Sequence, residues 1–271
     1  MSLPNKTQLL PDRPGIPPMA ALPEAETIDP AALAQAYAGG DIDLICVLGP
    51  TASGKTRYAV QLARALGNAE ILSADSRQVY RGMDIGTGKD LGEYGEVPYH
   101  LIDIVPAGSK YNIYEFQAAF ADAWADVRAR SAVPILCGGS GLYIEAATRA
   151  YKFDKGNGVS ADRLPQKTFY IGTLVTREER VARIDRRLDE RLENGLVEEI
   201  QGLLSSGIPA EDILWYGLEY KFVTQYVLGE LSYEEMRILL ANAIHQFAKR
   251  QMTWFRGMER DGVRIHWVLP Q

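Results

Sequence analysis

The sequence feature that most constrains the fold is a short glycine-rich segment, residues 49–56, which matches the pattern G-x-x-x-x-G-K-[ST] without a gap. Residues 44–48 before it are all apolar, which is typical of a strand buried on both faces. The alanine- and leucine-rich stretch after it predicts a helix to about Leu66. Backbone amides in such a turn, together with the helix N-terminus, attract an anion. The motif therefore predicts a phosphate-binding loop beside a buried strand.

The residue types of this loop each have a chemical use. The glycines let the backbone amides turn toward one centre, Lys55 adds a positive charge, and the Thr56 hydroxyl can bind Mg²⁺ that bridges phosphate oxygens. The candidate phosphate contacts are Gly49, Thr51, Ala52, Ser53, Gly54, Lys55 and Thr56. The loop alone does not identify the reaction, because kinases, hydrolases and other proteins that hold a diphosphate share it.

Hydrophobic patterns predict alternating strands and helices up to about residue 150. Strands are expected at 71–74, 99–104 and 133–137, and a helix at 115–130. Alternation of this kind predicts a parallel sheet covered on both faces. We expect an α/β fold of the P-loop NTPase type, with a parallel sheet flanked by helices and a mostly helical C-terminal part. The C-terminal expectations are strands at 168–175 and 264–269, and helices at 177–194, 196–205, 217–228 and 232–256.

Four segments are predicted along the chain. Seven of the 14 prolines fall within the first 30 residues, which indicates an extended, poorly ordered leader at 1–28. The P-loop α/β core is expected at 29–150. A loop follows at 151–167, and residues 168–271 form a helical part that completes the same catalytic domain.

Composition excludes several classes of protein. No stretch approaches the ~20 apolar residues that span a bilayer, and no secretory signal is visible. Two cysteines are too few for a disulfide scaffold. We therefore expect a cytoplasmic, soluble chain, and nothing in the sequence suggests an obligate dimer, so a monomer is expected. The 29 basic and 35 acidic residues give a formal net charge of −6, which argues against bulk electrostatic binding of nucleic acid but leaves room for a local basic groove.

Two acidic residues follow predicted strands. Asp75 comes directly after the strand at 71–74, and the carboxyl end of a parallel strand opens on the ligand crevice. Asp75 could act as a general base or as a Mg²⁺ ligand through water, or it could simply cap a turn. Asp103 is a second candidate and could be the carboxylate on the metal side.

Several further segments, taken with the loop, resemble the tRNA dimethylallyltransferase (isopentenyltransferase) family. They include Ser-Ala-Asp-Ser-Arg-Gln-Val-Tyr at 73–80 and Arg-Gly-Met-Asp-Ile-Gly-Thr at 81–87. The other matches are 100–103, 134–143, Arg183, 248–256 and 263–267. The resemblance covers roughly residues 44–268 and is far more specific than the loop alone.

The resemblance implies transfer of a dimethylallyl group from dimethylallyl diphosphate to the exocyclic amine of an adenine, which in tRNA lies 3′ of the anticodon. The loop and Arg183 would hold the leaving diphosphate, with Mg²⁺ at Thr56 as cofactor, and Asp75 would accept the amine proton. By position in the motifs, the residues at the target nucleotide are Asp75, Ser76, Arg77, Gln78, Ser140, Tyr220 and Lys221. Trp215, Tyr216 and Tyr220 could stack on a base or pack in the core.

The chain departs from the family pattern in one region. Family members that act on tRNA usually carry a helical insertion before the arginine-bearing helix, whereas only 39 residues separate Tyr143 from Arg183 here. Glu219-Tyr220-Lys221 also replaces the usual Gly-Tyr-Arg, and lysine does not reproduce a bidentate arginine contact. Three hypotheses follow: prenyl transfer to tRNA, the same chemistry on free AMP or another adenine nucleotide, and a P-loop kinase of small molecules with Asp75 as base.

Overall fold

A parallel sheet of six strands forms the centre of the molecule. The computed structural model describes residues 23–149 and 158–270. The strands lie in the order β4-β2-β6-β1-β7-β8, and each neighbouring pair is parallel. Their bounds are β1 Leu44–Leu48, β2 Ala69–Ser73, β4 Tyr99–His100, β6 Val133–Gly138, β7 Thr168–Thr173 and β8 Ile265–Val268. The α/β fold expected from the sequence is confirmed.

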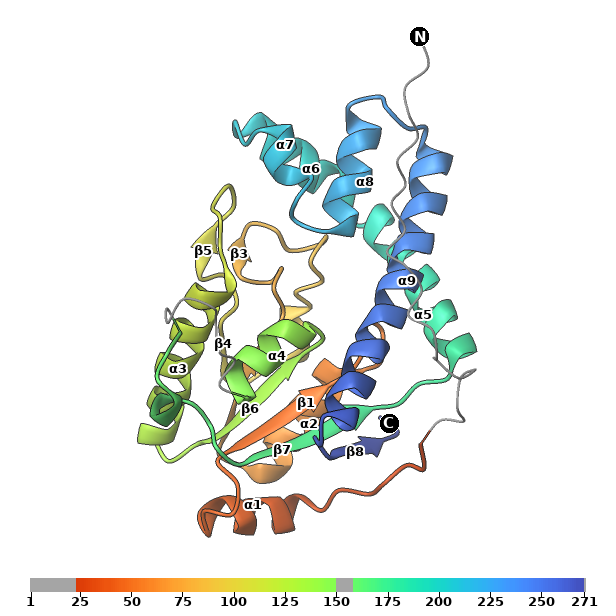
Figure 1. Ribbon diagram of the computed structural model, residues 1–271. Coiled ribbons are helices and arrows are strands. Elements are labelled where there is room, and N and C mark those ends of the chain that lie inside the picture. The colour runs from red at the N-terminus through yellow and green to blue at the C-terminus, as the bar shows by residue number, and fades with distance from the viewer. Residues whose placement is uncertain (1–22, 150–157, 271) are drawn as a thin grey trace.

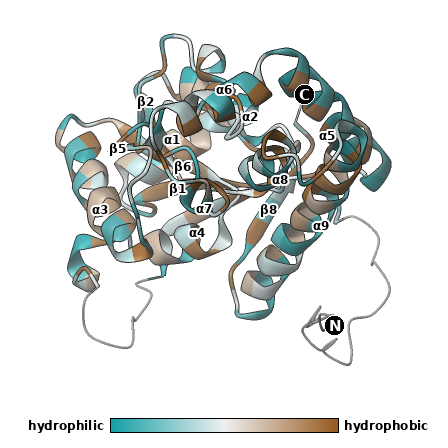
Figure 2. Ribbon diagram, turned by 90° about the horizontal axis from the view of Figure 1, so that it is seen from above, coloured by the Kyte–Doolittle hydropathy of each residue, from teal (hydrophilic) through white to brown (hydrophobic). Residues whose placement is uncertain are grey.

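Helices cover both faces of this sheet (Figure 1). In β1, Ile45 and Val47 face one layer, and Leu44, Cys46 and Leu48 face the other, as the two-residue period of a strand requires. The first layer contains α1 (Pro30–Ala38) and α2 (Lys55–Leu66), and the second contains α3 (Ile113–Ala129), α4 (Gly141–Thr148) and one end of α9 (Tyr233–Arg260). Figure 2 shows hydrophobic residues on the strands and hydrophilic ones on outward helix faces.

A third apolar core lies in the helical part of the chain. Val79 and Met83, from the segment after β2, pack with Leu188, Tyr220 and Leu240 from three different helices. The helices of this part are α5 Arg177–Glu193, α6 Leu196–Ser205, α7 Ala210–Ile213, α8 Leu218–Val227 and α9. Because α9 also packs on the sheet, it joins the two parts into one body (Figure 1).

Local signals explain where several helices begin. Asp29 caps α1, and Pro30 at the first helical position has a fixed φ that suits a helix start. The helix α9 starts at a capping box, in which Ser232 and Glu235 each accept from the other residue's backbone N–H. This helix extends four residues beyond the predicted end, to Arg260.

The strand expected at 99–104 is wrong in its length. Only Tyr99–His100 pairs in the main sheet, because Leu101 and Asp103 have φ values of 65° and 56°, which a strand does not accommodate. The chain then forms β5 (Val105–Pro106), which pairs with β3 (Tyr80–Arg81). Two short 3₁₀ turns, Leu91–Glu93 and Ala161–Arg163, complete the elements.

The predicted leader and the predicted loop at 151–167 are only partly described. Residues 1–22 and 150–157 lie outside the described residues. Within the described part of the leader, the Glu26 N–H donates to the Trp267 carbonyl at 2.7 Å, and its carboxylate contacts His266. No helix in the described ranges is long and apolar enough to cross a membrane.

Candidate active site

The phosphate-binding loop connects β1 to α2 in a strained, tightly packed turn. Ala52 and Gly54 have positive φ values of 60° and 82°. A Cβ at Gly49 would lie 2.1 Å from Oγ1 of Thr173, so only glycine fits there. The Ser53 hydroxyl is buried and lies 2.6 Å from the same Thr173 oxygen. Thr173 is the last residue of the neighbouring strand β7, so this strand holds the loop in place.

Gln251 of α9 connects the loop to the segment that follows the neighbouring strand β6. Its Oε1 accepts from the Thr51 N–H at 2.8 Å, and its Nε2 donates to the Gly139 carbonyl at 2.9 Å. The Gln251 side chain is buried, and its bond to Gly139 is shielded from water. Sequence reasoning included Gln251 only within the motif at 248–256 and gave it no role.

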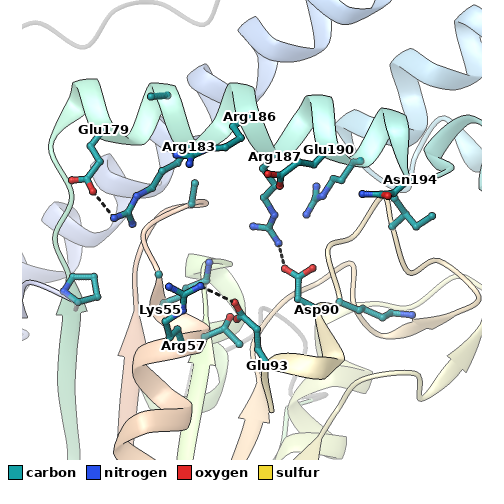
Figure 3. A pocket seen from close by; sticks show the side chains of 18 of the residues that line it. Lys55, Arg57, Asp90, Glu93, Glu179, Arg183, Arg186, Arg187, Glu190 and Asn194 are labelled. Atoms are coloured by element: carbon teal, nitrogen blue, oxygen red, sulfur yellow. Dashed lines mark hydrogen bonds and ion pairs between the residues drawn. The ribbon is translucent and has the colours of Figure 1, made fainter. Parts of the chain in front are cut away.

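A basic cavity of about 910 Å³ opens on one side of the loop. It is lined by Lys55 and Thr56 from the loop and by Arg183, Arg187 and Arg191 from α5. Figure 3 shows Arg183 and Arg187 extending from α5 toward the loop. A carboxylate pairs with each of these arginines: Glu179 with Arg183, Asp90 with Arg187 at 2.5 Å, and Glu219 with Arg191 at 3.0 Å. The guanidinium Nη1 of Arg183 lies 3.8 Å from where a Cβ on Gly54 would stand, so the predicted arginine is at the loop.

A second cavity, of about 600 Å³, opens on the other side of the loop. Five residues predicted at the target nucleotide line it together: Asp75, Ser76, Arg77, Gln78 and Ser140. Four side chains line both cavities: Lys55, Thr56, Arg187 and Arg191. The loop therefore lies between a basic site and a site that contains a carboxylate.

Asp75 is oriented by its own turn. Its Oδ1 accepts from the Arg77 N–H at 2.9 Å, and the Arg77 guanidinium donates to the Trp215 carbonyl at 3.1 Å. The Ser140 hydroxyl accepts from the Ser76 N–H at 3.2 Å. Among the described residues no hydrogen bond engages Oδ2 of Asp75, which leaves that oxygen able to accept a proton from a ligand.

Burial shifts the acidity of two groups that line the second cavity. Desolvation lowers the pKa of Lys55, while the negative charge of Asp75 acts in the opposite direction. Burial raises the pKa of the Cys137 thiol to about 12. Cys137 therefore stays neutral near pH 7 and is unsuited to act as a nucleophile.

Comparison with known proteins places this geometry in a family. The family model described as IPP transferase matches residues 78–167 and 153–258, and the one described as isopentenyl transferase matches residues 42–96. The curated tRNA dimethylallyltransferase 1 of Porphyromonas gingivalis is 46% identical over 282 residues, which cover 83% of this chain and 93% of that protein. The chain belongs to the tRNA dimethylallyltransferase family. It is accordingly a transferase.

Other relatives of the family agree with this assignment. The tRNA dimethylallyltransferase 1 of Parabacteroides distasonis is 44% identical, covering 83% of this chain and 92% of that protein. The crystal structure of the tRNA isopentenylpyrophosphate transferase of Bacillus halodurans matches with a TM-score of 0.73 and 28% identity, covering 83% of this chain and 88% of that one. The fold is therefore that of solved family members.

The aligned part of this chain is shorter than the aligned part of its relative. The match to the Porphyromonas gingivalis protein spans 282 positions, whereas 83% of this 271-residue chain is about 225 residues. The difference between these two numbers means that about 57 aligned positions of that protein have no counterpart in this chain. The two ranges of the IPP transferase match overlap at residues 153–167, where the sequence predicts that the usual helical insertion is missing.

Three residues predicted for the site lie elsewhere. Tyr220 is 1% exposed, and its hydroxyl donates to Glu199 at 2.6 Å, so it belongs to the helical core. Lys221 is exposed on α8, 5.4 Å from the Phe222 ring, and Asp103 pairs with buried Lys89. None of the three lines either cavity. From this segment, Glu219 lines the second cavity and pairs with Arg191 at 3.0 Å.

The three aromatic residues expected to stack on a base or to pack in the core lie in different surroundings. Tyr216 is buried, like Tyr220, and its hydroxyl donates to the Ser109 carbonyl at 3.1 Å. The Trp215 side chain is 81% exposed and lines neither cavity. Core packing thus accounts for the two tyrosines.

Glu199 of α6 was missed by sequence reasoning, although it fixes part of the site. Its carboxylate accepts from three successive backbone N–H groups, those of Asp84, Ile85 and Gly86, at 2.7, 2.7 and 3.0 Å. A Cβ at Gly86 would lie 2.6 Å from the Tyr220 ring. Residues 84–90 contribute to both cavities, so Glu199 and Tyr220 support the wall between them.

The residues at the loop fit Mg²⁺ when a diphosphate is also present. Within the described ranges, no group of three or more His, Cys, Asp or Glu side chains could hold a metal ion. Thr56 supplies one hydroxyl beside the basic cavity. Mg²⁺ commonly keeps several waters and binds through substrate phosphates, so this incomplete protein donor set suits an ion that arrives with its diphosphate.

Proposed function

We propose that this chain transfers a dimethylallyl group from dimethylallyl diphosphate to the exocyclic amine of an adenine in tRNA, the adenine 3′ of the anticodon. The observation that carries the proposal is the meeting of the two cavities at Lys55 and Thr56. One side offers cations for a leaving diphosphate, and the other offers a carboxylate for an acceptor. A direct transfer requires both partners within reach of one point.

The basic cavity suits the donor. As the C1–O bond of the dimethylallyl diphosphate breaks, negative charge grows on the leaving diphosphate. Lys55, Arg183 and the amides of the loop would stabilise that charge where it develops. When bound at Thr56, Mg²⁺ would neutralise further charge on the phosphate oxygens.

The second cavity suits the acceptor. The adenine amine is a weak nucleophile because its lone pair is delocalised into the ring. As its nitrogen bonds to C1, the amine must lose a proton, and Oδ2 of Asp75 would accept it. The Asp75 turn, fixed by the Arg77 N–H, holds the carboxylate in the cavity during this step.

The acceptor is assigned to tRNA on two grounds. The related proteins of Porphyromonas gingivalis and Parabacteroides distasonis are both named tRNA dimethylallyltransferase. The second cavity, at about 600 Å³, is also open to solvent at exposed Phe247 and Trp254, so a base at the end of a longer chain can enter. Free AMP remains the second candidate because about 57 aligned positions of the relatives are missing here.

The test uses the purified chain, Mg²⁺ and dimethylallyl diphosphate. Unmodified tRNA is offered in one reaction, and AMP, ADP and ATP in separate ones, with Lys55→Ala as the inactive control. We expect added dimethylallyl mass on tRNA only, and digestion should locate it on the adenine 3′ of the anticodon. If only a free nucleotide gained the dimethylallyl group, the acceptor would be that nucleotide and not tRNA. Phosphate transfer from ATP without any prenyl product would support the kinase hypothesis instead.

A further inference from the structure

Three side chains on one face of α9 lie at the open end of the acceptor cavity. We propose that Trp254, Phe247 and Arg250 form a subsite for the nucleotide next to the modified adenine, with Trp254 stacking on its base. The inference rests on the proposed function and deepens it, because it makes the acceptor an RNA segment of at least two nucleotides. Aromatic platforms combined with arginine are the usual means of binding single-stranded nucleic acid.

The spacing places these residues together. Phe247, Arg250 and Trp254 are three, four and seven residues apart, which puts them on one face of a helix. All three line the acceptor cavity. Phe247 is 38% exposed and Trp254 is 42% exposed, so both rings present open apolar surface to whatever enters.

Trp254 is held in one orientation although it is exposed. Its indole N–H donates to Oε2 of Glu145 at 3.1 Å. The ring also lies against the start of α4, where a Cβ at Gly141 would come within 2.4 Å of the indole. A ring that is fixed before the ligand arrives loses little conformational entropy on binding. Glycine at 141 and glutamate at 145 thus prepare an exposed platform.

Arg250 keeps its charge available beside this platform. Its guanidinium lies 5.8 Å from the centroid of the Phe247 ring, and within the described residues no ion pair engages it. An unpaired, exposed guanidinium beside two aromatic rings matches a nucleotide, which offers a flat base and a phosphate together. The neighbouring phosphate of the RNA is therefore its expected partner.

The position of the platform is fixed relative to the reacting groups. Gln251 is the residue after Arg250, and it bonds both the Thr51 N–H of the phosphate-binding loop and the Gly139 carbonyl. Asp75 and Lys55 line the same cavity, as does buried Cys137. Because Gln251 fixes α9 relative to the loop, a base on Trp254 is held at a set position relative to an adenine at Asp75.

The test compares Trp254→Ala, Trp254→Phe and Trp215→Ala. Trp215 is the matched control because it is exposed but lines neither cavity. With an anticodon stem-loop as acceptor, Trp254→Ala should raise the acceptor KM roughly 5- to 150-fold, the range that one base–aromatic stack supplies. The donor KM should stay unchanged, Trp254→Phe should retain most of the affinity, and Trp215→Ala should behave as wild type. Melting temperatures check that each variant folds.

A binding measurement separates this inference from the proposed function. A stem-loop with guanosine at the target position, added with inorganic diphosphate, should quench tryptophan fluorescence in wild type but not in Trp254→Phe. Quenching by this stem-loop, with no prenyl transfer by wild type to the matching adenosine stem-loop supplied with dimethylallyl diphosphate, would retain the subsite and overturn the proposed function. An unchanged RNA KM in folded Trp254→Ala, or an equal loss for RNA and for AMP, would overturn the subsite.

Discussion

Asp75 and Lys55 line the same cavity but have separable roles. Replacing Asp75 with Asn removes the proton acceptor and keeps an oxygen that can accept from the Arg77 N–H, so the turn should persist. We expect the transfer rate to fall by about 100-fold or more, the scale of a general base, while the affinity for inorganic diphosphate stays the same. Single-turnover kinetics and calorimetry measure the two quantities. Normal turnover by this variant would exclude Asp75 as the base.

Lys55 makes diphosphate binding sensitive to alkaline pH. Burial lowers the pKa of its ammonium group, and only the protonated form attracts the diphosphate. The affinity for diphosphate should therefore be highest below that lowered pKa and should decline as pH rises through it. The decline should begin at a lower pH than it would for a lysine with an ordinary pKa. Titration of inorganic diphosphate from neutral to alkaline pH tests this. Lys55→Arg should flatten the decline because a guanidinium stays protonated; an equally steep decline would assign it to another group.

Sequence reasoning located some site residues and missed others for a physical reason. Lys55 and Asp75 could be predicted because each belongs to a short motif that follows a strand, so local sequence determines where they lie. Gln251, Glu199 and Trp254 contribute through contacts across 50 or more residues, such as Thr51 with Gln251. No spacing within one segment encodes such a pair. Tyr220 was misplaced for the converse reason, since a motif position does not tell a buried tyrosine from an exposed one.

At the scale of elements, the segment 84–90 depends on a carboxylate from a distant helix. Glu199→Gln would replace one acceptor oxygen by an NH₂ group facing backbone N–H donors. We expect unfolding free energy to fall by about 1.5–3 kcal/mol, as for hydrogen bonds to charged groups. The KM values for donor and acceptor should both rise, because the segment lines both cavities.

Hydrogen exchange provides the direct measurement for this variant. The amides of Ile85 and Gly86 should exchange faster in Glu199→Gln. Glu198→Gln makes the same charge change at an exposed position on the same helix and should leave exchange unchanged. Equal effects from both variants would indicate a general charge effect and would contradict the supporting role of Glu199.

The elements themselves were largely predictable, with one instructive exception. Buried strands such as β1 and β6 and capped helices such as α9 carry their signals within the segment. The strand expected at 99–104 failed because Asp103 turns away to pair with Lys89, and the next residues join β3. The strand-forming residues at 99–104 do not reveal that Lys89, 14 positions before Asp103, binds the Asp103 carboxylate.

For the whole molecule, the distribution of charge matters more than its sum. A chain with a net charge of −6 still gathers Lys55 and the arginines of α5 around one cavity. We therefore expect most of the surface to offer an RNA no general attraction, and we expect RNA contact to be confined to the acceptor cavity and its open end. About 57 aligned positions of the Porphyromonas gingivalis relative, which could contact other parts of a tRNA, are missing.

This restriction predicts how much of a tRNA the enzyme uses. An isolated anticodon stem-loop should be prenylated with nearly the same kcat/KM as the whole tRNA, since few contacts lie outside the cavity. Binding should also depend weakly on salt, because the slope of log K against log salt is about −0.7 for each phosphate neutralised on a single strand. A longer family member that has the insertion serves as the control and should show a steeper slope. A strong preference for whole tRNA here, with a steep slope, would mean that an extended surface outside the cavity binds the RNA.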